Sequence, residues 1–165
     1  MTDGARVEAI FSTPGSGQPM AAVDAAEAFP GSGLAGDRYL LGTGRYSHKP
    51  GPDRHVTLIE AEALDVVRAA GFVLAPGEHR RNVVTRGIRL NDLVGRDFQA
   101  GALRLRGIRL CDPCASLEQV TARPGLMRAL VDKGGLRTEI VAGGMLRVGD
   151  AILVDDQAPP DAVPD

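Results

Sequence analysis

Glycine and proline interrupt this chain so often that only short helices and strands are expected. The sequence has 21 glycines and 11 prolines among its 165 residues, about a fifth of the chain. Such a composition favours short elements joined by tight turns over a helical bundle. Helical and strand-like runs also fail to alternate regularly, which argues against a doubly wound parallel sheet. The pattern predicts a mostly-β (α+β) fold, a β-barrel or barrel-like domain with a few short helices.

The expected elements follow from the local period of the apolar residues. Residues 61–71 have the pattern of a short helix that ends at Gly71, and residues 116–135 that of one or two short helices interrupted at Pro124. Residues 30–55 hold too much glycine and proline for a regular element. We expect one long loop there, or two loops around a short strand, of the kind that often binds ligands. Strands are expected at 5–11, 19–29 and 55–60, within 81–95, at 102–111, and two or three times within 137–154.

The run 102–111 alternates in two halves that are out of step. Leu103 and Leu105 share one face, whereas Ile108 and Leu110 continue the alternation one residue out of register. Gly107 stands at the slip, and a glycine inside an alternating strand is typical of a β-bulge. We therefore predict a bulge at Gly107.

The length and the ends of the sequence add further expectations. A chain of 165 residues predicts a single domain, over residues 1–155, and a disordered, acidic, proline-rich tail at 156–165. The N-terminus lacks a basic segment followed by an apolar one, and no apolar run approaches the ~20 residues of a membrane span. We expect a cytoplasmic protein that does not bind membranes and whose thiols stay reduced.

Positive charge is concentrated in one part of a chain whose net charge is only −2. Residues 80–109 carry eight arginines and two acids, and the long loop adds four more basic residues. Paired guanidinium N–H groups suit an anionic small molecule such as a phosphate, with Arg38 and Arg81 as first choices because they adjoin turn residues. Arg104 and Arg106 are expected on the solvent face of a half-buried strand. Aromatic residues do not interleave the basic stretch, so nucleic acid is not an expected partner.

The two cysteines, Cys111 and Cys114, lie three residues apart where a strand pattern ends. A structural zinc site needs about four ligands, and neither a second CxxC nor suitably spaced histidines are present, so zinc is not expected. A thioredoxin-like dithiol needs a βαβ context that this chain lacks. Two buried, inert thiols remain the plain alternative, because free cysteine is often buried.

Cys114 differs from Cys111 in its position along the chain. Asp112 and Pro113 mark the end of the strand, and Cys114 begins a helical pattern. The N–H groups and the dipole of a helix N-terminus stabilise a thiolate and lower the thiol pKa. A lowered pKa suits a nucleophile, a persulfide carrier or a soft-metal ligand. We therefore expect Cys114 to be the reactive thiol.

Six segments stand in a particular order along the chain. They are GLAGDRY (33–39), RHVTLIE (54–60), RRNVVTRGI (80–88), LVGRDFQAG (93–101), CDPCASLE (111–118) and GGMLRVGD (143–150). In this order the chain resembles the MOSC family, the molybdenum cofactor sulfurase C-terminal domain, over roughly residues 5–155. The resemblance implies a twisted, mostly-β barrel with peripheral helices and a pocket for the molybdenum cofactor (molybdopterin).

The resemblance also implies roles for individual residues. The family's reactive cysteine, which carries sulfur as a persulfide or ligates molybdenum, matches Cys114. The implied function is binding of the molybdenum cofactor, with sulfur carriage or cofactor sulfuration through that cysteine. The residues that match the family's pterin-phosphate contacts are Arg38, Arg54, Arg81, Asn82 and Thr85.

Three other functions are consistent with the same residues. The chain is alternatively a molybdenum-dependent reductase of N-hydroxylated compounds with Cys114 as metal ligand, a non-catalytic module that stores or delivers the cofactor, or a barrel with structural cysteines. The sequence contains no desulfurase-like domain, no additional β-barrel domain and no helical C-terminal extension. We therefore expect a separate protein to donate the sulfur or the electrons.

Overall fold

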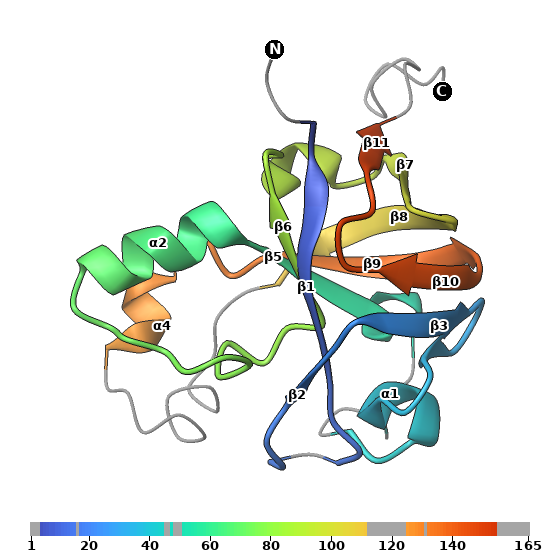
Figure 1. Cartoon of the computed structure of the whole chain (residues 1–165), viewed down its shortest axis with the longest axis horizontal. Coiled ribbons are helices and arrows are strands. Elements are labelled where there is room, and N and C mark those ends of the chain that lie inside the picture. The colour runs from blue at the N-terminus through green and yellow to red at the C-terminus, as the bar shows by residue number, and fades with distance from the viewer. Residues whose placement is uncertain are drawn as a thin grey trace.

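Strands dominate the structure, and its helices are few and short (Figure 1). It is a computed structural model that describes residues 4–15, 17–44, 47, 51–111, 125–130 and 132–154. The helices are α1 (Arg38–Leu41), α2 (Ala61–Ala69) and α4 (Leu126–Ala129), with 3-10 turns η1 (Pro52–Arg54) and η2 (Leu90–Leu93). None of the described helices is long and apolar enough to cross a membrane.

The strands form two sheets that share one core. The larger sheet contains, in spatial order, β11 (Ile152–Val154), β7 (Asp97–Ala100), β8 (Leu103–Leu110), β9 (Leu136–Ala142), β5 (Val56–Glu60), β6 (Val83–Arg86), β1 (Arg6–Ser12) and β2 (Ala21–Val23). The smaller sheet contains β10 (Gly144–Arg147), β3 (Ala25–Phe29) and β4 (Gly33–Leu34). β5 and β6 are parallel, and α2 lies in the crossover that a parallel pair requires. The expected mostly-β fold is confirmed.

The large sheet curls toward a barrel without completing one. Arg6 in β1 forms a single bridge with Ala151, and the N–H of Ile152 donates to the carbonyl oxygen of Ala5 at 2.8 Å. No ladder joins β1 to β11 in the described chain, and the ladder of β11 is with β7. The contact between β1 and β11 is therefore confined to one turn, and strand pairing does not close the expected barrel.

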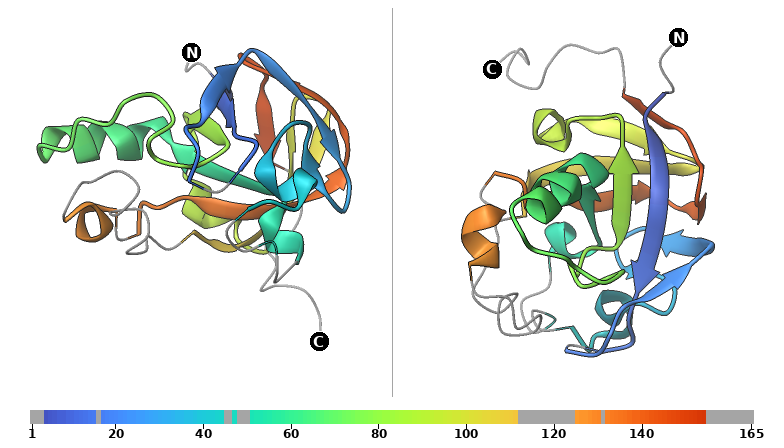
Figure 2. Two further views of the ribbon diagram at one scale, coloured as in Figure 1. Left: turned by 90° about the horizontal axis from the view of Figure 1, so that it is seen from below. Right: turned by 60° about the vertical axis from the view of Figure 1, so that its left-hand side comes forward.

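Two apolar clusters hold the fold together. The larger one takes buried side chains from both sheets, so it fills the concave side of the curled sheet. The smaller one joins Ile59 and Val84, on the outer face, to Ala63 and Val67 of α2 and to Leu130. The views in Figure 2 agree with this packing, since α2 and α4 lie together at one side of the large sheet. The expected helix at 61–71 is confirmed, and Gly71 just after it has a φ of 103°.

Most of the expected strands are present, and the predicted bulge is confirmed. The ladder between β8 and β9 shifts register between Gly107 and Arg109, and shifts a second time between Arg104 and Leu105. A Cβ on Gly107 would lie 2.1 Å from the carbonyl oxygen of Leu93, so only glycine lets the chain pass this closely. The run 137–154 supplies β9, β10 and β11, in agreement with the prediction.

Two strand predictions need correction. The run 19–29, expected as one strand, breaks at Asp24 into β2, which pairs with β1, and β3, which pairs with β10 in the other sheet. Alanine has little strand preference, so distant pairing partners rather than local sequence decide where this segment bends. Strand β7, which has four residues, was not predicted. The expected helix start at Cys114 and the tail 156–165 lie outside the described residues.

Candidate functional site

A row of polar residues crosses the outer face of the large sheet. Arg109 in β8 pairs with Arg137 in β9, and Arg137 pairs in turn with Thr57 in β5. Asn82, just before β6, continues the row by donating its N–H to the carbonyl oxygen of Thr57 at 3.0 Å. Neighbours of these residues along each strand belong to the main core, so the row faces the other way. We call Arg109, Arg137, Thr57 and Asn82 the outer-face row.

Asn82 is fully engaged in hydrogen bonds within the protein. Its Oδ1 accepts from the N–H of Thr57 at 3.2 Å and from the hydroxyl of Thr57 at 3.3 Å. Its Nδ2 donates to the carbonyl oxygen of Phe11 and to Oδ1 of Asp37, both at 3.1 Å. The Asn82 side chain, which is 1% exposed, therefore links β1 and β5 by hydrogen bonds to the glycine-rich loop, residues 30–55.

Asp37 attaches the glycine-rich loop to the sheet. Its buried Oδ1 accepts from the N–H of Thr13 and from Nη1 of Arg38, both at 3.2 Å. Its Oδ2 accepts from the N–H of Tyr39 at 3.4 Å and so caps α1. Nη2 of Arg38 also donates to the carbonyl oxygen of Arg80 at 3.3 Å. Arg38 thus forms an ion pair with the buried carboxylate of Asp37.

The arginine end of the row carries more positive than negative charge. Arg109 donates from Nε to Oδ2 of Asp53 at 2.9 Å. Burial alone raises the pKa of Asp53, but the Arg109 hydrogen bond and the charges of Arg54, Arg109 and Arg137 hold it below its usual value. Like charges that face each other across a ladder destabilise a sheet, and Arg109 faces Arg137. Nε of Arg137 is buried and has no hydrogen-bond partner in the part of the chain that the structure describes.

A pocket of about 620 Å³ lies beside the arginine end of the row, between the glycine-rich loop, η1 and β9. Arg54 and His55 line it on one side, and Tyr39 of α1 and Glu139 of β9 contribute to its other walls. His55 is buried, and its Nδ1 accepts the N–H of Ile140 at 3.1 Å. Burial lowers the pKa of His55, although the nearby carboxylates oppose the effect, so the ring is neutral at pH 7.

Arg81 contacts the segment just before β9, which lies beside the residue that follows β8. It donates from Nε to the carbonyl oxygen of Gly134 at 2.8 Å. The next residue, Gly135, accepts the N–H of Cys111 at 2.7 Å. Arg81 and Cys111 therefore hold two successive carbonyl groups at the start of β9. Cys111 is a free, buried cysteine, and Cys114 lies outside the described residues.

The predicted site residues fall into separate places. Arg38 and Asn82 come together through Asp37, and Arg54 joins the arginine cluster around Asp53. Thr85 is fully buried in β6, beside residues of the main core, and its hydroxyl has no hydrogen-bond partner among the described residues. Its binding to a ligand stays a prediction, as do the binding roles of the other four residues.

Sequence reasoning missed Arg137 altogether. The residue lies outside the basic stretch 80–109, and the sequence gives no sign that it faces Arg109. The stretch itself does not form one patch, because Arg86 pairs with Glu8 at 2.5 Å and Arg106 pairs with Asp97 at 2.7 Å. Half of the Arg106 side chain is exposed, as expected for a solvent-facing strand position.

The described residues offer anion binding rather than metal ligation by the protein alone. In those parts of the chain, no group of three or more His, Cys, Asp or Glu side chains lies close enough together to hold a metal ion. The charges of Arg54, Arg109 and Arg137, by contrast, all act on the carboxylate of Asp53. Arginine binds phosphate oxygens through paired N–H donors, so this cluster is suited to a ligand that carries a phosphate group.

Comparison with solved structures supports the fold. The YuaD protein from Bacillus subtilis superposes with a TM-score of 0.75 and 18% identity, covering 92% of this chain and 96% of its own. YiiM from Geobacillus stearothermophilus gives a TM-score of 0.67 at 15% identity, covering 92% of this chain and 75% of its own. YiiM from Escherichia coli gives a TM-score of 0.65 at 19% identity, covering 93% of this chain and 71% of its own. At these identities the likeness concerns the fold alone.

Comparison of the sequence with protein families identifies the family. No curated protein matches the chain by sequence. The profile of the MOSC domain matches residues 45–153, from the glycine-rich loop to β11. This match covers more than half of the sequence, and the chain therefore belongs to the MOSC domain family.

Proposed function

We propose that this chain binds the molybdenum cofactor at the arginine end of the outer-face row and carries sulfur on Cys114. MOSC domains are associated with the molybdenum cofactor, whose pterin bears a phosphate group. The observation that most supports the proposal is the pairing of Arg109 with Arg137, which puts like charges face to face. A bound phosphate would neutralise both guanidinium groups and remove the repulsion between them.

The residues present fit a phosphate-bearing cofactor. Nε of Arg137 is buried without a partner among the described residues, so it is a donor available to an anionic oxygen. The pocket beside Arg54 has a volume of about 620 Å³. Small-molecule sites usually measure about 300–1,000 Å³, so a pterin-sized ligand suits this pocket.

In this proposal each described residue has a limited role. When bound, the cofactor supplies the molybdenum centre that receives sulfur. Arg54, Arg109 and Arg137 hold the phosphate, and Arg81 holds Gly134, next to the carbonyl group of Gly135 that accepts the N–H of Cys111. The position at which the cysteine motif leaves the sheet is thereby set.

Cys114 performs the sulfur chemistry in the proposal. Its thiolate attacks the outer sulfur of a persulfide on a donor protein, which forms an S–S bond on Cys114 and releases the donor as a thiolate. A nucleophile that attacks the outer sulfur of the Cys114 persulfide takes that sulfur and releases Cys114 as a thiolate. We propose a sulfur-donating protein as a partner.

The proposal is tested by analysing protein purified from a host that makes the cofactor. We expect pterin and molybdenum near one per chain, together with labile sulfur that disappears in Cys114→Ser. Molybdenum that depends on Cys114, without labile sulfur but with reduction of N-hydroxylated compounds, would favour the reductase instead. Absence of pterin from protein made in that host would contradict cofactor binding.

A further inference from the structure

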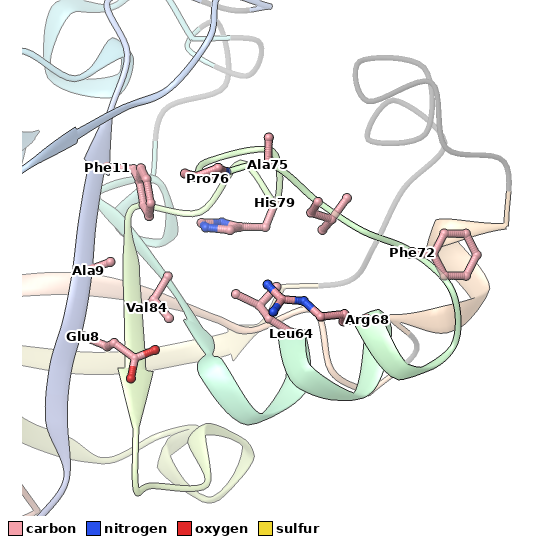
Figure 3. A pocket seen from close by; sticks show the side chains of 11 residues that line it. Glu8, Ala9, Phe11, Leu64, Arg68, Phe72, Ala75, Pro76, His79 and Val84 are labelled. Carbon is pink, nitrogen blue, oxygen red and sulfur yellow. The ribbon is translucent and has the colours of Figure 1, made fainter.

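A second cavity, of about 230 Å³, lies between α2, β1, β6 and the segment 72–79 (Figure 3). Its walls are mainly apolar and include Phe11, Leu64, Phe72 and Val84. It shares no lining residue with the pocket beside Arg54. An apolar cavity of about 150 Å³ already admits benzene, so this one is large enough for a small organic molecule.

His79 is the buried polar group of this cavity. It is 3% exposed, and its ring packs edge-on against Phe11, with ring centroids 5.1 Å apart. Figure 3 shows the imidazole projecting into the space between Phe11, Val84 and Leu64. Because a polar group at such a position is costly without a partner, its hydrogen bonds decide what the cavity can hold.

The protonation state of His79 is fixed by its neighbours. Burial and the charges of Arg81 and Arg80 lower the pKa of His79 to about 3, so the ring is neutral at pH 7. Its Nδ1 accepts the N–H of Arg81 at 3.0 Å, which leaves the ring proton on Nε2. The cavity is therefore lined by a buried histidine that is neutral and carries its ring N–H on Nε2.

The charges around the cavity favour an anion at that donor. The charges of Arg80 and Arg81, which disfavour a proton on His79, also favour a negative group beside it. Arg68 of α2 adds an exposed guanidinium at the lining, and Figure 3 shows it alongside Leu64. The other ionised lining residue, Glu8, is already bonded to Arg86 at 2.5 and 3.3 Å.

We propose that this cavity binds a small monocarboxylic acid with an apolar body. The body lies between Phe11, Leu64 and Phe72, and the carboxylate accepts the Nε2–H of His79 and pairs with Arg68. This combination of apolar walls, a neutral N–H donor and a nearby guanidinium matches such an acid better than a purely apolar or a polyanionic ligand. The inference does not depend on cofactor binding.

Benzoate is a suitable probe, titrated into the full chain by calorimetry and followed by amide chemical shifts. We expect saturable binding of one benzoate per chain, with shifts at His79 and Leu64. Benzamide, which keeps the ring and an acceptor but lacks the charge, should bind about tenfold more weakly. Acetate lacks the apolar body, so we expect no saturable binding of acetate to the chain. Absence of saturable benzoate binding would overturn the proposal.

Two variants locate the binding. Leu64→Trp fills the cavity and should abolish binding, whereas the exposed change Arg68→Gln should weaken it about three- to tenfold. Arg147→Gln, an exposed arginine on β10 in the other sheet, is the matched control and should bind benzoate as the wild type does. Benzoate affinity unchanged by Arg68→Gln in a folded protein would show that the acid binds elsewhere and would also overturn the proposal.

Discussion

His79 illustrates how strongly the surroundings of one residue can alter its chemistry. Its pKa is about 3 in the folded chain, because it is buried beside Arg81 and Arg80, against about 6.5 in an unfolded one. As the pH falls below about 6.5, the unfolded chain takes up this proton and the folded chain does not. The contribution of His79 to stability is therefore complete above pH 6.5 and is lost toward pH 3, by about 1.4 kcal/mol per pH unit.

His79→Asn tests this account, since the asparagine side-chain oxygen can still accept the N–H of Arg81. When the pH is lowered from 7 to 5, the free energy of unfolding of the wild type should fall by about 2 kcal/mol more than that of the variant. His55, whose pKa is lowered in the same direction, contributes equally to both proteins and cancels. Urea unfolding at the two pH values measures the difference. Equal losses would mean that His79 titrates normally in the folded chain.

The two cysteines should differ in reactivity and in the effect of replacement. Cys114→Ser exchanges a soft thiolate for a hard, neutral hydroxyl, so sulfur or molybdenum binding should vanish while the fold survives. Cys111 is buried at the end of β8, so Cys111→Ser should keep most of the function but cost about 1–2 kcal/mol of stability.

Alkylation rates of the two single-cysteine variants against pH measure the reactivity. Cys114 should react with an apparent pKa below the free-thiol value of about 8.5, and Cys111 should react slowly because it is buried. Faster labelling at Cys111, or an apparent pKa of Cys114 at or above that value, would remove the support for a reactive Cys114.

At the scale of elements, the bulge in β8 fixes how the preceding turn packs. The N–H of Gly107 donates to the carbonyl oxygen of Arg96 at 2.9 Å, and its carbonyl oxygen accepts from Gly95 at 2.8 Å. Gly107→Ala would place a Cβ 2.1 Å from the carbonyl oxygen of Leu93 and force these segments apart. We expect a loss of about 2–4 kcal/mol in the free energy of unfolding.

Gly4→Ala is the matched control for this substitution, because a Cβ there would meet no heavy atom within 4 Å. It should change the stability by less than about 0.5 kcal/mol. Denaturant unfolding of both variants gives the comparison. If Gly107→Ala were as stable as the control, the close approach of β8 to Leu93 would be wrong.

Elements with a clear local period were predictable from the sequence. The apolar face of α2 carries such a period, β5 is a short run rich in β-branched and apolar residues, and Gly107 indicated the bulge in β8. The division of 19–29 between two sheets was not predictable, because it depends on pairing with β1 and β10, far away in the sequence. Local propensity has no information on such partners.

At the scale of the whole molecule, strand order determines which residues form the candidate site. β8, β9, β5 and β6 are neighbours in the sheet, which is why Arg109, Arg137, Thr57 and Asn82 form one row. The sequence predicted Arg38, Arg54, Arg81, Asn82 and Thr85 as a set and placed Arg104 and Arg106 on a solvent face, but it did not point to Arg137. Only the folded chain separates Arg38, bonded to Asp37, from the arginines that face one another across β8 and β9.

The proposed cofactor site makes a specific prediction about Arg137. Replacing it by glutamine removes a like charge opposite Arg109, so the stability of the cofactor-free chain should be unchanged or slightly higher. The same change removes a donor to the phosphate, so cofactor binding should weaken about tenfold or more. A purely structural arginine would not separate the two effects in this way. Arg106→Gln is the control, because Arg106 is paired with Asp97 on an exposed strand position.

The most direct test is the molybdenum and pterin content of the wild type, Arg137→Gln and Arg106→Gln, purified identically from a host that makes the cofactor. The wild type and Arg106→Gln should retain the cofactor equally, and Arg137→Gln should lose most of it while unfolding at the same urea concentration or higher. Equal cofactor content in all three proteins would contradict a phosphate site at the outer-face row.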